Sequence, residues 1–224
     1  MVSARTGSAT ESGKPILLLG ATEYADVFID AFETVPGVRL AGCVQNLDPA
    51  ADSREILGRP VYWAGSLDDL RQSHDLICIL GTTKRRAWIG EMAQRGFAFA
   101  TLVHPSSTVS QRSVLGPGVS VDAATVVAGF SCIGDHVRIG RRVAIGHHTE
   151  IGHYSTVHPG VVICGHCSIG EQVTIGAGAV IIDRVAIGDG AFVAAGALVT
   201  KDVPSRALVA GHPGRVVRPN YGPR

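Results

Sequence analysis

The sequence lacks several features that would assign it to a functional class at once. It has no apolar run of 18 residues, so no segment is predicted to span a membrane. Its longest Lys/Arg run is Lys84–Arg86 and its net charge is only +1, which gives no electrostatic case for binding nucleic acid or an anionic membrane. Residues 1–14 lack the apolar core of a secretory signal, and we expect them to form a disordered leader on a cytoplasmic protein.

Cysteines are few, and their number is odd. The five are spread along the whole chain, which argues against a disulfide framework. Two of them form a CxxC pair, Cys164 and Cys167, for which a redox role has to be considered. With 46% hydrophobic and 17% charged residues among 224, the chain has enough apolar material for a folded, soluble protein of one large or two modest domains.

An internal repeat of six residues governs the second half of the sequence. Every sixth residue from Val109 to Val199 is aliphatic, sixteen in all without an insertion, and a small or β-branched residue follows each one after four positions. This period fits neither an amphipathic helix nor an alternating strand, but it is typical of a solenoid of short stacked strands. Glycine often follows the aliphatic position, as at Gly146, and we expect it to supply the permissive backbone of a tight corner.

The repeat resembles the hexapeptide motif of the left-handed parallel β-helix found in acyltransferases. Three hexads form one coil in that fold, so sixteen hexads predict about five coils, stacked roughly 4.8 Å apart. In this repeat Cys167 takes a small inward position and Cys164 a corner position. We therefore interpret the CxxC pair as structural, because a β-helix offers no helix start that would activate a thiol.

A different domain precedes the repeats. Residues 14–33 begin as an apolar strand, turn at a glycine and continue with Val27 and Ala31 at helical spacing. Residues 38–46 are predicted to form a second strand, and residues 75–96 a later strand that runs into another helix. This order predicts a parallel sheet with ligands at the carboxyl ends of its strands. The turn after the first strand has one glycine where a dinucleotide fingerprint has three, so NAD binding is not indicated.

The two halves together resemble the sialic acid and bacillosamine type of hexapeptide-repeat sugar acetyltransferases. The hexad array carries this resemblance, with a terminal GHPGRVVR that is similar to the G-x-P-A-K-x-x-R tail of these enzymes. It implies a Rossmann-like nucleotide-sugar-binding α/β domain over 15–103, a β-helix acetyltransferase domain over 104–204 and a C-terminal tail over 205–224. It also implies a homotrimer that binds acetyl-CoA in the groove between adjacent β-helices.

The resemblance places His147 at the family's catalytic histidine. The reaction needs a base that takes a proton from the attacking amine, and imidazole titrates near neutral pH. In the bacillosamine enzymes the next residue is a glutamate that orients this histidine, whereas the chain has His148 there. Glu150 or a residue of an adjacent chain is the candidate replacement, unless His147 works without one.

Four other positions complete the comparison with the family's groove. Thr156 stands where the family has a second groove histidine, and His158 lies two residues away as a candidate substitute. His153 and His166 are interpreted as solvated side chains.

The cofactor and substrate residues follow from the same resemblance. The backbone at Gly165 and Ala195 aligns with positions that contact CoA, and the phosphates of CoA would be within reach of Lys201, His212 and Arg215. The carboxyl ends of the predicted strands would hold a nucleotide-linked amino sugar through Gly20, Thr22, Gln45, Asn46, Thr82, Thr83, Lys84 and Arg85. The family's turn histidine and acidic pair are absent there, so the sugar or nucleotide recognised is expected to differ.

Three alternatives remain open at this point. An O-acetyltransferase acting on a sialic-type sugar fits the same residues as an N-acetyltransferase. A zinc protein similar to gamma-class carbonic anhydrases fits the spacing of His148 and His153, but Arg112 and Pro117 occupy the positions 36 residues upstream where further histidines would be needed. The third alternative is a binding module without catalysis. We expect an enzyme that needs no metal.

Overall fold

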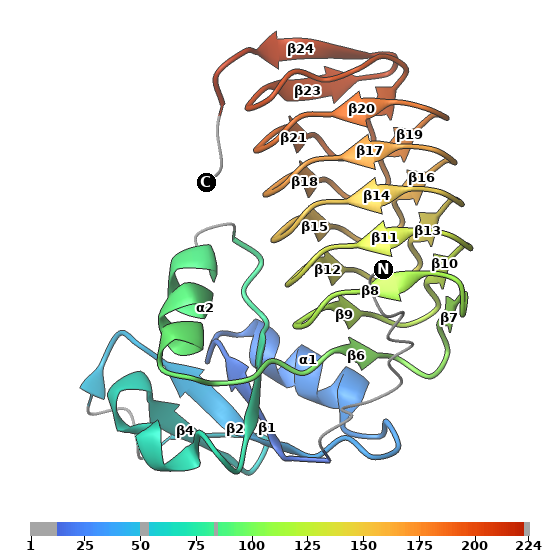
Figure 1. The fold of residues 1–224 in the computed structure, drawn as a ribbon. Helices are drawn as coiled ribbons and strands as arrows, with labels where there is room; N and C mark the ends of the chain where they lie inside the picture. The colour runs from blue at the N-terminus through green and yellow to red at the C-terminus, as the bar shows by residue number, and fades with distance from the viewer. Residues whose placement is uncertain (1–12, 50–53, 83–84, 222–224) are drawn as a thin grey trace. The chain divides into compact units, whose positions relative to one another are not determined.

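A computed structural model describes residues 13–49, 54–82 and 85–221 of the chain (Figure 1). The expected leader lies almost entirely outside the described residues, as do Thr83 and Lys84. The chain divides into two compact units, of which one ends at Leu102 and the other begins at Val103. Neither described helix is long and apolar enough to cross a membrane.

The first unit is an α/β unit built on a five-stranded sheet. The strand order is β3-β4-β2-β1-β5, and every neighbouring pair is parallel except β3 and β4. The elements are β1 (Ile16–Leu19), α1 (Tyr24–Phe32), β2 (Leu40–Gln45), β3 (Glu55–Ile56), β4 (Arg59–Trp63), the 3₁₀ turns η2 (Ala64–Ser66) and η3 (Asp68–Leu70), β5 (Asp75–Cys78) and α2 (Arg85–Gln94).

Strands β1 and β5 of this sheet are buried on both faces. All four residues of β1 are fully buried, and successive side chains of a strand point to opposite faces. Ile16 and Leu18 share a core with Phe28 and Phe32 of α1. Val27, which was expected on the apolar face of this helix, is instead 40% exposed, because the buried stripe runs through Ala25, Phe28, Ile29 and Phe32.

The second unit is a left-handed parallel β-helix, and the hexad positions account for its strands. Each of the sixteen strands from β7 to β22 has two residues, and the second is the aliphatic residue of its hexad. The strands are β6 (Leu102–Val103), β7 (Thr108–Val109), β8 (Val114–Leu115), β9 (Ser120–Val121), β10 (Val126–Val127), β11 (Cys132–Ile133), β12 (Arg138–Ile139), β13 (Ala144–Ile145), β14 (Glu150–Ile151), β15 (Thr156–Val157), β16 (Val162–Ile163), β17 (Ser168–Ile169), β18 (Thr174–Ile175), β19 (Val180–Ile181), β20 (Ala186–Ile187), β21 (Phe192–Val193) and β22 (Leu198–Val199).

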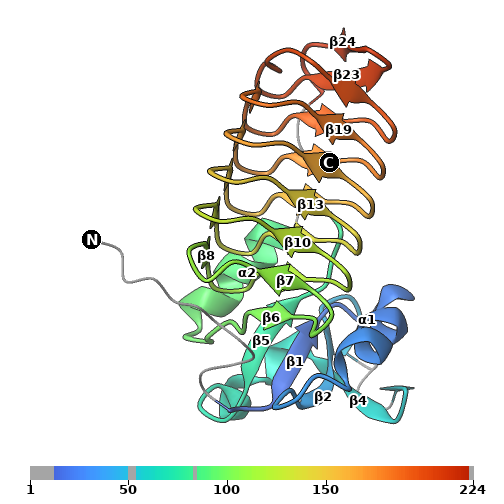
Figure 2. The same cartoon turned by 90° about the vertical axis from the view of Figure 1, so that its right-hand side faces the viewer.

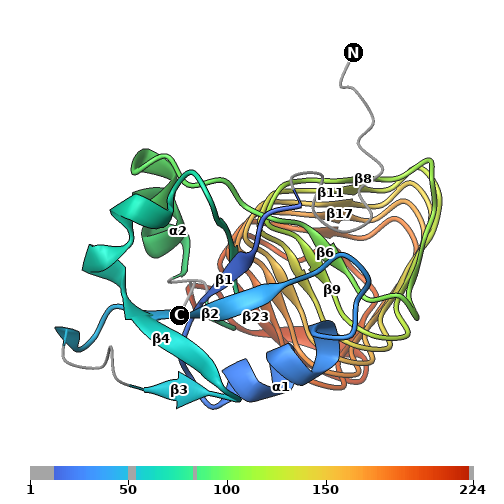
Figure 3. The ribbon, with the colours of Figure 1, turned by 90° about the horizontal axis from the view of Figure 1, so that it is seen from below.

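Three parallel sheets form the sides of the β-helix. Strands pair with the strand 18 residues away, as Val126 does with Ala144 and Val162 with Val180, so one coil contains three hexads as predicted. The sheets run β22-β19-β16-β13-β10-β7, β20-β17-β14-β11-β8 and β24-β23-β21-β18-β15-β12-β9-β6. Figure 2 shows strands of the first of these sheets stacked one above another, and Figure 3 shows the coils superposed along the stack.

The small inward residues of the repeat form a hydrogen-bonded ladder inside the coils. The hydroxyl of Ser131 donates to the carbonyl of Gly146 at 2.9 Å, and that of Thr149 donates to the carbonyl of Cys164 at 3.0 Å. Cys167 occupies the same place one coil further, and its thiol lies 3.2 Å from the carbonyl of Ile182. Burial raises the pKa of Cys167 and also that of Cys164, so neither thiol is activated, and the structural interpretation of the CxxC pair fits this arrangement.

The glycines of the repeat have a different reason from the one expected. The backbone of Gly146 is not in the left-handed region. The residue of this corner that adopts a left-handed backbone is His148, with a φ of 55°. A Cβ on Gly146 would lie 2.5 Å from the carbonyl carbon of Cys164 and 2.6 Å from the nitrogen of Gly165, both in the backbone of the next coil. The position therefore requires glycine because neighbouring coils approach closely, and not because the turn is tight.

This close approach gives a stability prediction for Gly146→Ala. The added methyl group meets backbone atoms that cannot rotate away, so we expect a loss of about 1–3 kcal/mol in unfolding free energy, as for overpacked cores. The midpoint of thermal unfolding measured by circular dichroism should fall by roughly 5–10 °C. Gly129→Ala is the matched control, because its Cβ would meet only the Ser110 hydroxyl, at 3.3 Å. Equal midpoints for the two variants would contradict the steric account.

The parallel ladder continues beyond the expected end of the β-helix at residue 204. β23 (Leu208–Gly211) pairs in parallel with β21, and β24 (Gly214–Arg218) returns antiparallel to β23. The tail expected over 205–224 is thus in part a further strand of one sheet and a hairpin at the end of the stack (Figure 1).

Candidate active site

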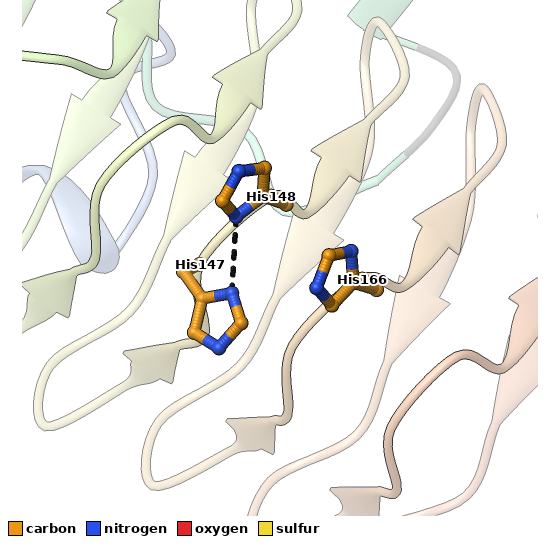
Figure 4. Close-up of side chains that lie close together, drawn as sticks. All are labelled: His147, His148 and His166. Carbon is orange, nitrogen blue, oxygen red and sulfur yellow. Dashed lines mark hydrogen bonds between the residues drawn. The ribbon is translucent and has the colours of Figure 1, made fainter.

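Three histidines meet at one corner of the β-helix. His147 and His148 lie in the turn between β13 and β14, and His166 lies in the equivalent turn of the next coil. All three are exposed. The ring centroid of His166 is 5.0 Å from that of His147 and 4.9 Å from that of His148 (Figure 4). His166, which was expected to be an isolated solvated side chain, is therefore exposed but part of this cluster.

One hydrogen bond joins the two consecutive histidines. The Nδ1 atoms of His147 and His148 are 3.0 Å apart, so one of them donates a proton and the other accepts it. If His147 donates through Nδ1, its Nε2 carries no proton and can act as a base. In that tautomer His148 orients the ring of His147, which is the role expected of a glutamate at this position.

The ring of His147 has space because the next coil carries a glycine at the facing position. A Cβ on Gly165 would lie 3.0–3.4 Å from three atoms of the His147 ring. The N–H of Gly165 donates to Oδ1 of Asp183, one coil further, at 2.9 Å. This N–H is therefore already used within the chain, so a contact of Gly165 with CoA would involve its other atoms.

A column of stacked side chains extends from the histidine corner along the β-helix. The guanidinium of Arg112 lies over the ring of Phe130, which stacks on His148 at 4.9 Å, and His148 stacks on His166. These residues follow one another every 18 positions, once per coil. At the end of the column, desolvation and then the charge of Arg184 lower the pKa of His166, which favours its neutral form at pH 7.

The other residues considered for catalysis lie away from this corner. Glu150 points outward from β14, and within the described ranges its carboxylate makes no hydrogen bond or ion pair. The ring of His153 accepts the N–H of Asp135 through Nδ1 at 2.8 Å, at the following corner of the coil. Thr156 is buried on β15, and His158 follows that strand at a third corner. In one chain, therefore, His148 is the only one of these candidates hydrogen bonded to His147 among the described residues.

The residues expected to bind CoA lie at two edges of one sheet and at the end of the stack. Gly165 and Lys201 share the corner column of His147, one and three coils further along. Ala195 lies at the opposite edge of the same sheet, and its N–H donates no hydrogen bond within the part of the chain that the structure describes. His212 and Arg215 are exposed on the hairpin of β23 and β24. A single chain does not bring these residues around one point.

The sheet between these two edges presents an unusually apolar outer surface. Its outward positions, here called the apolar face, are Thr108, Val126, Ala144, Val162, Val180 and Leu198. Val126 is 48% exposed and Val162 is 38% exposed. The outward positions of the other two sheets include charged residues, such as Arg138 and Glu150. The apolar face directly adjoins the histidine corner.

The substrate residues expected in the α/β unit lie at one edge of its sheet. β1 lies between β2 and β5, so the strand order reverses next to β1, which is where ligands bind in open parallel sheets. Gly20 and Thr22 follow β1, Gln45 and Asn46 follow β2, and Thr82 follows β5. Gly20 has a φ of 128°, and a Cβ there would lie 2.9 Å from the Leu80 side chain.

Two of these substrate residues are occupied by contacts within the chain. Oε1 of Gln45 accepts the N–H groups of Leu47 and Asp48, at 2.8 and 2.9 Å. Arg85 at the start of α2 is only 1% exposed, and its guanidinium donates to the Thr82 carbonyl at 3.2 Å. Arg85 thus holds the loop after β5 through this hydrogen bond, and its guanidinium is buried and not exposed to solvent.

Sequence reasoning missed two members of the histidine corner. His166 and Asp183 stand 18 and 36 residues after His148 and His147, respectively. The signal was present, because a period of three hexads places these positions one coil and two coils along. The residues in these turns follow no regular motif, so the sequence does not indicate which of them come into contact.

Comparisons with known proteins were made for the sequence and for the fold. A family model described as "Bacterial transferase hexapeptide (six repeats)" matches residues 133–165 and 166–201. No curated protein sequence matches the chain.

Solved structures that are similar over almost the whole chain include the following three. PerB from Caulobacter crescentus, in complex with CoA and GDP-perosamine, is 30% identical, with a TM-score of 0.82 over 94% of this chain and 99% of that one. A variant of perosamine N-acetyltransferase from Caulobacter crescentus, with the same two ligands, is 29% identical, with a TM-score of 0.83 over 94% and 99%. The acetyltransferase domain of PglB from Neisseria gonorrhoeae is 26% identical, with a TM-score of 0.81 over 91% and 100%.

Proposed function

The chain belongs to the hexapeptide-repeat acetyltransferases that act on nucleotide-linked amino sugars, and we propose that it moves an acetyl group from acetyl-CoA to the amino group of such a sugar. The similar structures support both substrates, since PerB is in complex with CoA and GDP-perosamine and the PglB domain with acetyl coenzyme A. The observation that carries the proposal within this chain is the exposed His147–His148 pair at the corner beside the apolar face.

In the proposed reaction His147 acts as the general base. Its Nε2 takes a proton as the amine nitrogen attacks the thioester carbon, and the carbonyl oxygen becomes an oxyanion. The C–S bond then breaks, and the departing CoA thiolate recovers the proton from His147. His148 holds the ring of His147 through the 3.0 Å contact between the two Nδ1 atoms. A backbone N–H in the groove would stabilise the oxyanion.

The proposed cofactor site extends from the histidine corner toward the end of the stack. Lys201 lies three coils beyond His147, about 14 Å along the axis at the spacing of paired strands. Gly165 lies nearer His147, and Lys201 and Arg215 offer positive charge to the phosphates of an elongated cofactor, with His212 beside Arg215 on the terminal hairpin. A neighbouring chain is needed to bring these residues to one groove. The N–H of Ala195, which donates no hydrogen bond to any described residue, is the candidate backbone donor from the other edge of the sheet.

We expect Arg215→Ala to separate the two substrates kinetically. The guanidinium is exposed and donates to the carbonyl of the adjacent Gly214 at 2.8 Å, so its removal should leave the fold intact. The loss of one charged contact to phosphate, worth roughly 1.5–3 kcal/mol, should raise KM for acetyl-CoA by about tenfold to a hundredfold. Steady-state CoA release should show an almost unchanged KM for the sugar. An equal rise in both KM values would contradict the assignment.

The nucleotide sugar is proposed to bind at the carboxyl edge of the α/β sheet. Gly20, Thr22 and Thr82 surround the point where the strand order reverses, and Asn46 is exposed beside them. Thr83 and Lys84 lie outside the described residues and remain candidates from the sequence. Arg85 and Gln45 are proposed to hold the backbone of the loops at this edge, Arg85 after β5 and Gln45 after β2, in addition to any contact that they make with the ligand.

A panel of UDP-, GDP- and TDP-linked amino sugars, each assayed for CoA release and product mass, tests the proposal. Turnover of at least one of them, with the mass increase of one acetyl group on nitrogen, is expected. Turnover of a free acid sugar alone would favour the O-acetyltransferase. No release of CoA with any acceptor would favour a non-catalytic binding module.

We also propose that the chain works as a homotrimer in the cytoplasm. The apolar face lies between the two edges that carry the CoA residues, so a neighbouring chain that covers it would bring these edges to a shared groove. The five cysteines are all free thiols, which fits a reducing compartment.

A further inference from the structure

We propose that His147, His148 and His166 bind a divalent transition-metal ion of the zinc type, and that this ion switches the enzyme off. The inhibitory role depends on the proposed function of His147 as a base, whereas binding of the ion does not. Each histidine offers one ring nitrogen, and the three nitrogens lie within 4.8 Å of one another. Together they form a ligand set from two successive coils of one chain (Figure 4).

The geometry of the cluster is close to that of a three-histidine site. Zinc–nitrogen bonds of 2.0–2.1 Å in a tetrahedral site place ligand nitrogens about 3.3 Å apart. The Nδ1 atoms of His147 and His148 are already 3.0 Å apart. The wider separations, up to 4.8 Å, would have to shrink by about 1.5 Å to reach the zinc geometry, which ring rotation can supply.

Rotation of the three rings toward an ion breaks one hydrogen bond and the stacking of His148 between Phe130 and His166. Within the described ranges, the contact between His147 and His148 is the one hydrogen bond that their ring nitrogens make. The side chains are exposed, whereas the backbone that carries them is held by the coil: the N–H of His148 donates to the carbonyl of Gly129, and that of His166 to the carbonyl of His147. Because the backbone of this corner is hydrogen bonded to neighbouring coils, the exposed imidazoles can turn toward an ion without unfolding of the coil.

The ligand chemistry selects the kind of ion. Imidazole nitrogen suits zinc, cobalt, nickel and copper, whereas magnesium and calcium prefer oxygen ligands. Three protein ligands leave the fourth position to water. An ion bound in this way uses the lone pair of His147 and holds its ring, so the base is no longer available to the amine.

Titration of the purified full-length protein with Co²⁺, followed by its visible absorption, tests binding directly. We expect one ion per chain, displaced by Zn²⁺ and not by Mg²⁺. His166→Asn should weaken binding by about tenfold or more, since one of three ligands is lost. Asparagine suits this position because residue 166 has a φ of 58°, a conformation that asparagine tolerates. His153→Asn is the matched control outside the cluster and should bind as the parent protein does.

The activity measurement tests the switch. Zn²⁺ at a saturating concentration should abolish CoA release by the parent protein, and EDTA should restore it. In the presence of Zn²⁺, His166→Asn should retain a much larger fraction of its own metal-free activity than the parent protein does, whereas EDTA alone should lower the activity of neither protein.

Four results would overturn the inference: unchanged Co²⁺ binding in His166→Asn, equal loss in His153→Asn, no inhibition by bound Zn²⁺, or stimulation by Zn²⁺. If no acceptor sugar is turned over, the Co²⁺ titration still decides whether the site exists. Failure of the proposed function and failure of the metal site are therefore distinguishable.

Discussion

Replacing His147 by alanine should lower kcat for acetyl transfer by roughly 10²–10⁴, the range that general base catalysis contributes. KM for both substrates should change little, because the imidazole is proposed to act on the proton of the amine and not to hold either substrate. Stopped-time assays of CoA release with the preferred amino sugar, together with calorimetric binding of CoA to the variant, give both quantities.

The control for this variant is His153→Ala. His153 is also a partly exposed histidine at a corner, but it lies at a different corner and accepts the Asp135 N–H. Its kcat should remain within about twofold of the parent value, as for a surface substitution away from the site. A fall in kcat as large as that of His147→Ala, or an unchanged kcat in His147→Ala, would contradict the role of His147 as the base.

His148→Asn then tests how His147 is oriented. Asparagine suits the left-handed backbone at residue 148, whose φ is 55°, but it places no ring nitrogen beside His147. A loss of kcat comparable to that of His147→Ala would mean that the two histidines act as a unit. A small loss would mean that a residue of a neighbouring chain orients His147 or that His147 works without such a partner, because Glu150 makes no hydrogen bond or ion pair among the described residues.

Val162→Glu should dissociate the proposed trimer and abolish most of the activity. Val162 lies in the middle of the apolar face, between Ala144 and Val180 of the adjacent coils. A carboxylate buried there costs several kcal/mol when no partner compensates it, and each chain would contribute one. We expect the dissociation constant of the assembly to rise by about 10³ or more. Light scattering at micromolar concentration should report a monomer, with CoA release reduced in parallel.

Val114→Glu is the matched control for this experiment. It makes the same substitution at an outward position of another sheet, on β8, where the pairing neighbour is Cys132. This variant should keep the mass and activity of the parent protein. Dissociation of both variants would show that the effect is not specific to the apolar face, and a trimeric Val162→Glu variant would place the interface elsewhere.

The hexads alone determined the fold of the second unit. The aliphatic residues at every sixth position can share one core only if each lies on a short strand with its side chain directed into the coil. The strands β7 to β22 therefore coincide with those positions. The choice of His147 as the candidate base came from the resemblance to the sugar acetyltransferases, because the frame of the repeat assigns each residue only to a strand or a corner, and several histidines stand at corners. The exposed Val27 shows the limit of such reasoning in the α/β unit, where a short helix has several possible apolar stripes.

Only the tertiary structure decided what surrounds His147. A corner residue gains its neighbours from the coils above and below, and their alignment depends on hydrogen bonds between strands 18 residues apart. These bonds bring His166 to the rings of His147 and His148 and place Asp183 on the Gly165 N–H. They also explain the glycine at position 146, which is required by the backbone of the next coil. Periodicity in the sequence predicts which way a side chain points, whereas the close contacts between coils determine what it touches.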